Sequence, residues 1–150
     1  KLGRSVSNLY FHDRFMRAEN NVFSVENANE GILHLLFHLA VFVSPDTPRV
    51  FAIDNLETAL NPQLCRLLTK SLAELSVERG KQAFVTTHNP AVLDGLNLRD
   101  DRQRLFIGSR DGDGHTQVKR LASKPALTEG KYKLSELWMR GHLGGLPDAF

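Results

Sequence analysis

The stretch that most constrains the fold is residues 49–62 (RVFAIDNLETALNP), where a short apolar run leads directly into an acidic residue. Residues 50–53 have the composition of a buried strand, and Asp54 follows them at once. Strands of parallel sheets are continuous apolar runs of this kind, and open α/β sheets hold ligands beyond the carboxyl ends of their strands. We therefore expect Asp54 at a ligand-binding edge, where a carboxylate suits Mg²⁺ beside a nucleotide phosphate.

Helical and strand patterns alternate around this run. Residues 29–43 predict a helix that is apolar nearly all round and therefore packed on several sides, with Asn27 or Asn29 as its N-cap. Pro62 begins a second predicted helix, 62–79, whose leucines recur at spacings of three and four. Residues 82–87 predict a second short strand, and a brief helix is expected at 91–96.

The remaining segments predict smaller elements. Residues 104–109 and 115–121 have strand patterns on either side of an Asp-Gly-Asp-Gly turn, which indicates a hairpin. Weaker strand patterns occur at 5–11 and 22–25, and a helix is expected at 134–139. The element order predicts an α/β fold, with a parallel sheet core flanked by helices and an antiparallel hairpin appended. We expect residues 1–121 to form the main domain, with 122–150 as a helical, glycine-rich tail packed on it.

Composition limits the class of protein. Hydrophobic residues make up 41% and charged residues 24%, as in ordinary soluble domains, and the net charge of +2 gives no strong attraction to nucleic acid. Cys65 is the single cysteine, which excludes an internal disulfide and favours a reducing compartment. The longest apolar run, 32–43, is too short to span a bilayer. We therefore expect a cytoplasmic protein without a membrane partner. Because the chain begins at Lys1 with neither methionine nor a secretory leader, we also expect a piece of a longer protein.

Three features fall where a nucleotide-binding sheet needs them. Asp54 ends one predicted strand and His88 ends the next, so both lie at the same edge of a parallel sheet. Residues 29–31 begin a helix, whose first N–H groups have no partner within the helix and can face a phosphate.

In this order the features resemble the C-terminal lobe of an ABC-type ATPase head, nearest to the prokaryotic AAA-family subgroup related to RecF, SMC and OLD-type ATPases. Asn29-Glu30-Gly31 resembles the signature motif, and residues 50–54 resemble the Walker B strand. Residues 56–62 resemble the D-loop region with its leucine-x-proline ending, and 86–90 (TTHNP) resemble the switch-histidine segment. The resemblance covers residues 24–121 and implies a P-loop NTPase fold.

The resemblance also implies roles for individual residues. Asp54 would help to hold Mg²⁺ through its water shell, and His88 would contact the γ-phosphate of ATP. Asn29, Glu30 and Gly31 would cap a nucleotide held by a partner protomer. Such heads bind ATP between subunits, which implies a homodimer or higher oligomer. The usual settings are DNA repair and anti-phage defence, with nucleic acid and an effector protein such as a nuclease as implied partners.

Two departures from the family pattern bear on catalysis. Asn55 stands where the family places a glutamate that activates the attacking water, and an amide can orient water but cannot take its proton. Loss of a general base costs about 10²–10⁴ in rate, although Glu57 could substitute. In addition, the sequence contains no G-x-x-x-x-G-K-[ST] phosphate loop, which we expect upstream of Lys1 if it exists. ATP hydrolysis is therefore expected only with that loop. The alternative is a non-hydrolysing interaction module that recruits a partner protein.

Other residues allow competing interpretations. His34 and His38, with Glu30 one turn earlier, have a spacing that can bind zinc, or they are histidines of a buried helix. Asp111 and Asp113 form either a metal-binding pair or part of a turn.

Two further patterns concern nucleic acid. Glu129-Gly130 faintly resembles the start of a Toprim nuclease domain, but the aspartates that such a domain needs precede it here instead of following it. Lys119, Arg120 and Lys124 form either a nucleic-acid contact or a solvated face.

Overall fold

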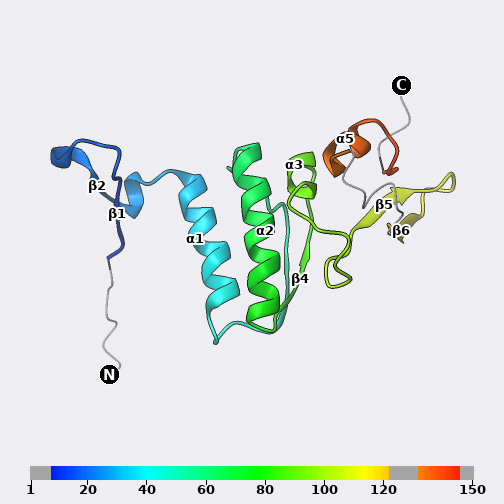
Figure 1. Ribbon diagram of the computed structural model, residues 1–150, viewed down its shortest axis with the longest axis horizontal. Helices are drawn as coiled ribbons and strands as arrows, with labels where there is room; N and C mark the ends of the chain where they lie inside the picture. Colours follow the sequence, from blue (N-terminus) through cyan, green and yellow to red (C-terminus); the bar gives the residue numbers. More distant parts are fainter. Residues whose placement is uncertain (1–7, 122–131, 146–150) are drawn as a thin grey trace.

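Two helices and a pair of parallel strands form the centre of the molecule (Figure 1). The computed structural model describes residues 8–121 and 132–145. Helix α1 (Glu30–Val43), strand β3 (Val50–Ile53), helix α2 (Pro62–Glu78) and strand β4 (Gln82–Val85) follow one another along the chain. Strands β3 and β4 pair in parallel, with Val50 opposite Gln82 and Ile53 opposite Val85. The expected α/β class is confirmed.

Short elements lie on both sides of this centre. Strands β1 (Tyr10–His12) and β2 (Val22–Ser24) form an antiparallel pair that the sequence did not predict as a pair. Helix α3 (Pro90–Leu93) follows β4, and strands β5 (Phe106–Arg110) and β6 (Thr116–Arg120) form the predicted hairpin. Helix α5 (Leu134–Met139) packs against α3. The division into a main domain and a tail stays a prediction.

The parallel sheet is smaller than expected. Within the described ranges every sheet has two strands, so β3 and β4 lack further neighbours there. The face that carries Phe51, Ile53 and Ala83 contributes to the core, whereas Val50 and Phe84 on the other face are each 57% exposed. An extended parallel core is therefore not established, because buried parallel strands normally have cover on both faces.

The hydrophobic core lies between α1, α2 and the β3–β4 pair. Phe42 and Phe51 make an edge-to-face contact, with 5.0 Å between ring centroids. Burial of a large apolar side chain stabilises a fold by about 1.5–3 kcal/mol, so each large member of this cluster contributes to stability. Its fully or nearly buried members are Phe42, Ile53, Leu56, Cys65, Leu68, Leu72 and Val92.

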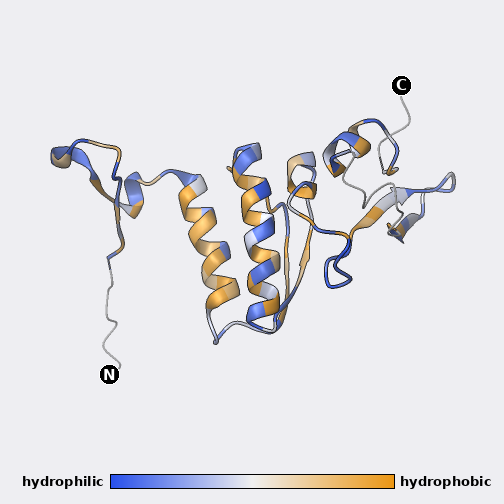
Figure 2. Ribbon diagram, in the orientation of Figure 1, coloured by the Kyte–Doolittle hydropathy of each residue, from blue (hydrophilic) through white to orange (hydrophobic). Residues whose placement is uncertain are grey.

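Helix α1 is much less enclosed than its sequence suggested. Figure 2 shows it as hydrophobic along almost its whole length. Only Gly31, His38 and Phe42 are buried, while Phe37 is 59% exposed. The expectation of packing on several sides was wrong, because among the described helices only α2 lies alongside it.

Local signals for the helix ends were reliable. The side-chain oxygen of Asn29 accepts from the N–H of Gly31 at 2.8 Å, and Asn61 accepts from Leu64 N at 2.9 Å, so both act as N-caps. Pro62 is the first residue of α2, as predicted. Leu67, one of the leucines that recur at spacings of three and four in this helix, is exposed, whereas Cys65 is fully buried.

Lys81 holds the other end of α1. Its ammonium group donates to the carbonyl oxygens of Val41 at 2.8 Å and Ser44 at 2.5 Å, and it also bonds to the hydroxyl of Thr47. A cation at the last carbonyls of a helix is favoured by the helix dipole. No helix in the described part of the chain is both long and apolar enough to cross a bilayer.

Candidate functional site

Asp54 and Thr86 lie side by side because β3 and β4 end at the same edge. The parallel register sets Ile53 opposite Val85, so the residues that follow both strands are neighbours. The hydroxyl of Thr86 donates to Asp54 Oδ1 and accepts from the N–H of Asn55 at 3.0 Å. Asp54 is exposed, and its Oδ2 has no hydrogen-bond partner among the residues described. The carboxylate is thus oriented through one oxygen, and the other is available to a cation or its water shell.

Glu57 is joined to the segment after β4. Its Oε2 accepts from Thr87 Oγ1 at 2.6 Å, and its Oε1 accepts from the N–H of His88 at 2.9 Å. Partial burial acts to raise the pKa of the Glu57 carboxyl, but the hydrogen bonds from Thr87 and His88 outweigh it and lower the pKa overall. Glu57 therefore remains an ionised acceptor that ties the loop after β3 to His88.

His88 has a fixed backbone and an exposed side chain. Its N–H is held by Glu57, and the next residue, Asn89, caps α3 by accepting from Ala91 N at 2.9 Å. The N–H of Asn89 also donates to Thr87 Oγ1 at 3.0 Å. The imidazole of His88 projects from a well-anchored backbone and is accessible to a ligand.

Asn55 has a left-handed backbone conformation, with a φ of 52°. Asparagine tolerates this region better than most residues with a side chain, and the penalty for others is roughly 1–2 kcal/mol. The Asn55 carbonyl accepts from the hydroxyl of Thr58 at 2.8 Å, which closes the turn. Asparagine, rather than the glutamate that the resemblance implies, therefore stands at a position whose backbone geometry suits it.

The start of α1 lies directly against the loop after β3. A Cβ on Gly31 would approach the carbonyl oxygen of Ala59 to 2.7 Å, so only glycine fits this contact. Ala59 itself has a φ of 59°. Glu30, next to Gly31, is exposed and lies with its Oε1 3.6 Å from His34 Nε2. The predicted signature-like residues and the predicted D-loop are thus in contact.

The structure brings some of the predicted site residues to one pocket and leaves others outside it. Glu30, Asp54 and Asn55 line a pocket of about 570 Å³ between α1 and β3. Glu57 and His88 do not line it, but they are connected to it through the neighbouring pair Thr86 and Thr87. Which of these residues bind a nucleotide or act in catalysis stays a prediction.

Sequence reasoning missed the roles of Thr86 and Thr87. They were included in the histidine segment, but no function was given to their hydroxyls. The sequence did contain a clue: two hydroxyl residues follow β4 directly, and two carboxylates, Asp54 and then Glu57, follow β3. Each threonine proves to hold one carboxylate.

The zinc interpretation of α1 is not supported. His38 is 3% exposed, and its Nδ1 donates to the carbonyl oxygen of His34 at 2.6 Å. Burial lowers the pKa of His38, which favours the neutral ring. Among the described residues, the side chains of Glu30, His34 and His38 do not form a group with converging ligand atoms. His38 is a structural residue of the helix, and the partly exposed His34 lines the pocket beside Glu30.

The hairpin aspartates organise a turn. Asp111 Oδ1 accepts from the N–H groups of Asp113 at 3.1 Å and His115 at 2.8 Å, and its Oδ2 accepts from Gln117 at 3.0 Å. Ligand atoms of Asp111, Asp113 and His115 do lie within 4.8 Å of one another, but these hydrogen bonds account for the arrangement of Asp111.

Of the remaining residues that were candidates for nucleic-acid contact, only some lie in the described part of the chain. Arg120 forms an ion pair with Asp101 at 3.4 Å, as a solvated face would. Lys124 and the Glu129-Gly130 pair lie outside the described residues.

Comparison with known proteins identifies a protein family that matches this chain. A family model described as "AAA domain, putative AbiEii toxin, Type IV TA system" matches residues 5–94, more than half of the 150 residues. The matched region includes α1, β3, α2, β4 and α3, with Asp54, Glu57 and His88, and it ends before the hairpin. No curated protein matches the chain.

Proposed function

This chain belongs to the AAA domain family just described, and from that premise we propose that it supplies the Walker B and switch-histidine elements of an ATP-dependent enzyme. Membership relates the chain to P-loop ATPases, which bind nucleotides and generally use ATP with Mg²⁺. Our proposal is more specific than family membership: the chain forms the C-terminal lobe of an ABC-type head.

One observation carries the proposal. The carboxylates that follow β3 are connected to the hydroxyls that follow β4, Asp54 through Thr86 and Glu57 through Thr87. In P-loop ATPases an aspartate at this kind of strand end helps to hold Mg²⁺. Asp54, with Oδ2 available, has that role in our proposal, and His88 contacts the γ-phosphate. Asn29, Glu30 and Gly31 cap a nucleotide that a partner protomer holds.

The expected chemistry is slow hydrolysis. Asn55 can orient a water molecule but cannot accept its proton. The hydrogen bonds that lower the pKa of Glu57 also make it a poor base near neutral pH. We therefore assign Glu57 to positioning His88 rather than to proton abstraction. The site then holds ATP longer than a head with a glutamate at position 55.

The proposal requires parts outside this sequence. A phosphate-binding loop must come from another stretch of polypeptide, because these residues contain none. ATP bound between two such heads would make the assembly a homodimer or a higher oligomer. A role in DNA repair or anti-phage defence, with a nuclease as effector and nucleic acid as target, follows from the subgroup that the sequence resembles.

A second candidate is a non-hydrolysing interaction module. It is favoured by Asn55 and by the exposed apolar side chains Phe37 and Phe84, which could contact a partner protein. In that case the strand-end carboxylates would maintain the loop structure only.

The two functions predict different results in an ATPase assay. The assay uses this chain together with the polypeptide that carries the phosphate loop. We expect Asp54→Asn and His88→Ala to abolish turnover, and Asn55→Glu to accelerate it by up to about 10²-fold through restored base catalysis. Asp46→Asn is the control, since Asp46 is an exposed acidic residue in the loop after α1. Turnover that is unchanged in both Asp54→Asn and His88→Ala would refute a catalytic role for this site, and absence of turnover in the wild type would favour the interaction module.

A further inference from the structure

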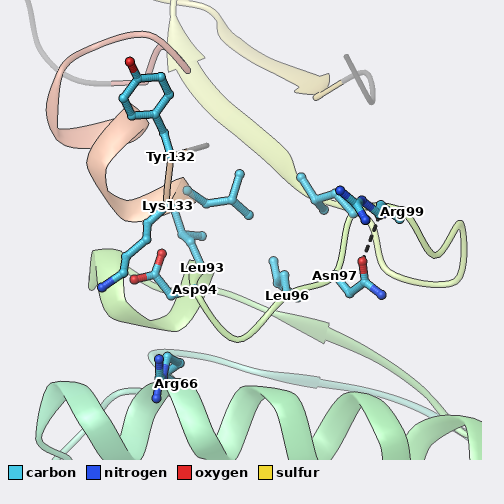
Figure 3. Close-up of a pocket in the computed structure, with 10 residues that line it drawn as sticks. Arg66, Leu93, Asp94, Leu96, Asn97, Arg99, Tyr132 and Lys133 are labelled. Carbon is cyan, nitrogen blue, oxygen red and sulfur yellow. Dashed lines mark hydrogen bonds between the residues drawn. The ribbon is translucent and has the colours of Figure 1, made fainter. Parts of the chain in front are cut away.

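A second pocket lies apart from the proposed ATP site, between α2, the loop after α3 and the start of α5 (Figure 3). Its volume is about 210 Å³. Four leucines form its apolar part: Leu93, Leu96, Leu98 and Leu134. Three cationic side chains also line it, Arg66 from α2, Arg99 from the loop and Lys133 from the residue before α5. The pocket thus combines an apolar surface with a cationic rim.

The three segments around this pocket are fixed to one another. A Cβ on Gly95 would lie 2.5 Å from both the Arg66 carbonyl oxygen and Thr69 Cβ, so the loop is in direct backbone contact with α2. Asp94 accepts from the N–H of Ser135 at 3.0 Å and from its hydroxyl at 2.8 Å, which joins the loop to α5. The segments that carry the cationic side chains are therefore held together by contacts within the protein.

The charges in the pocket are not balanced. Asp94 is the one acidic residue of the lining against three cationic ones, and it keeps its negative charge while its oxygens accept from Ser135. Across residues 8–121 and 132–145, the side chains of Arg66 and Lys133 have neither an ion-pair partner nor a hydrogen-bond partner, whereas Arg99 is already engaged. Arg66 and Lys133 are exposed, so water screens their charges, but an anion bound between them would be attracted to both.

We propose that this pocket binds a small organic phosphate, with the phosphate on Arg66 and Lys133 and the organic group on the leucines. A guanidinium can bind two phosphate oxygens at once, and an ammonium adds a compact charge. The pocket volume of about 210 Å³ leaves room for an organic group beside the phosphate. The leucines would exclude water from a small aromatic or aliphatic group. This site is independent of the proposed ATP site.

Titration calorimetry with the full 150-residue chain tests the proposal, with phenyl phosphate as the probe. We expect phenyl phosphate to bind at least about tenfold more tightly than inorganic phosphate or phenol, because it alone uses both parts of the pocket. Arg66→Gln and Lys133→Gln should each weaken binding by about tenfold or more, since each removes a charge-assisted hydrogen bond. Leu96→Ala should reduce the preference for phenyl phosphate over inorganic phosphate.

The matched control is Arg79→Gln, which removes an exposed arginine just beyond the end of α2 and outside the pocket. It should leave the affinity for phenyl phosphate unchanged. Thermal unfolding of each variant shows whether it is folded, and Arg66→Lys, which keeps the charge, should bind with intermediate affinity. Equal binding of all three probes, or equal affinities in Arg66→Gln, Lys133→Gln and the control, would overturn the proposal. Tighter binding of a 5′-phosphorylated oligonucleotide together with no binding of phenyl phosphate would also overturn it.

Discussion

The Thr87 hydroxyl donates to the Glu57 carboxylate across the ends of the two parallel strands, with 2.6 Å between Oγ1 and Oε2. The same carboxylate accepts from His88 N at 2.9 Å. A single side chain from the loop after β3 therefore fixes the position of the segment after β4. The alignment of these two segments depends on both this carboxylate and the strand register.

The first prediction concerns the strength of that connection. Thr87→Val should destabilise the fold by about 1.5–3 kcal/mol, because it removes a hydrogen bond to a charged and partly buried group. A double-mutant cycle with Glu57→Gln in urea unfolding should give a coupling energy of about 1 kcal/mol or more. Thr116→Val, at an exposed position of β6, is the control and should change stability by less than about 0.5 kcal/mol. Additive effects of the two site mutations would contradict the coupling.

The second prediction concerns acid stability. The folded-state pKa of Glu57 lies below the ordinary value of 4.5, so the unfolded chain binds more protons in the acid range. The stabilisation from this carboxylate is present above the unfolded pKa and is lost as pH falls through the folded pKa. Urea unfolding measured from pH 6 down to about pH 3 should therefore show a shallower loss of stability for Glu57→Gln than for the wild type. Parallel curves would show that the pKa of Glu57 is unshifted.

The third prediction concerns Gly31. Gly31→Ala should destabilise the protein by about 1–3 kcal/mol, because its Cβ would press on the carbonyl oxygen of Ala59. Gly112→Ala is the matched control, since a Cβ there meets no atom within 4 Å. Thermal unfolding of both variants provides the comparison. If Gly31→Ala unfolds no earlier than Gly112→Ala, the helix start and the loop are not in the contact described.

The fourth prediction concerns the carboxyl end of α1. Lys81→Met should cost about 2–3 kcal/mol, because it leaves the Val41 and Ser44 carbonyl oxygens without their charged donor. Lys70→Met removes an exposed lysine of α2 and should have little effect. Hydrogen exchange of the last turn of α1 should accelerate in Lys81→Met only. Equal exchange rates in the two variants would refute the role of Lys81.

Local features of the fold could be predicted from the sequence, whereas most contacts between distant segments could not. Asn29 and Pro62 act through neighbours within a few residues, so their positions at helix starts were predictable. The exposure of Phe37 depends on which elements surround α1, and no pattern within the helix contains that information. Composition and periodicity describe one segment at a time.

The candidate site shows the same limit. Asp54 and His88 were predicted at one edge from strand order alone, and the strands that precede them do end together. The pairing of Thr86 with Asp54 and of Thr87 with Glu57 depends on the register, which the strand patterns do not specify. The link between Asp94 and Ser135 joins residues far apart in the chain and was equally inaccessible.

The contact between Gly31 and Ala59 connects the start of α1 directly to the loop after β3. At about 1.5 Å per residue, the 14 residues of α1 form a helix about 21 Å long. One end bears on the loop that carries Asp54 and Asn55, with no side chain between the two backbones, and the other end is anchored by Lys81. A ligand that displaces that loop would therefore also press on the first turn of α1.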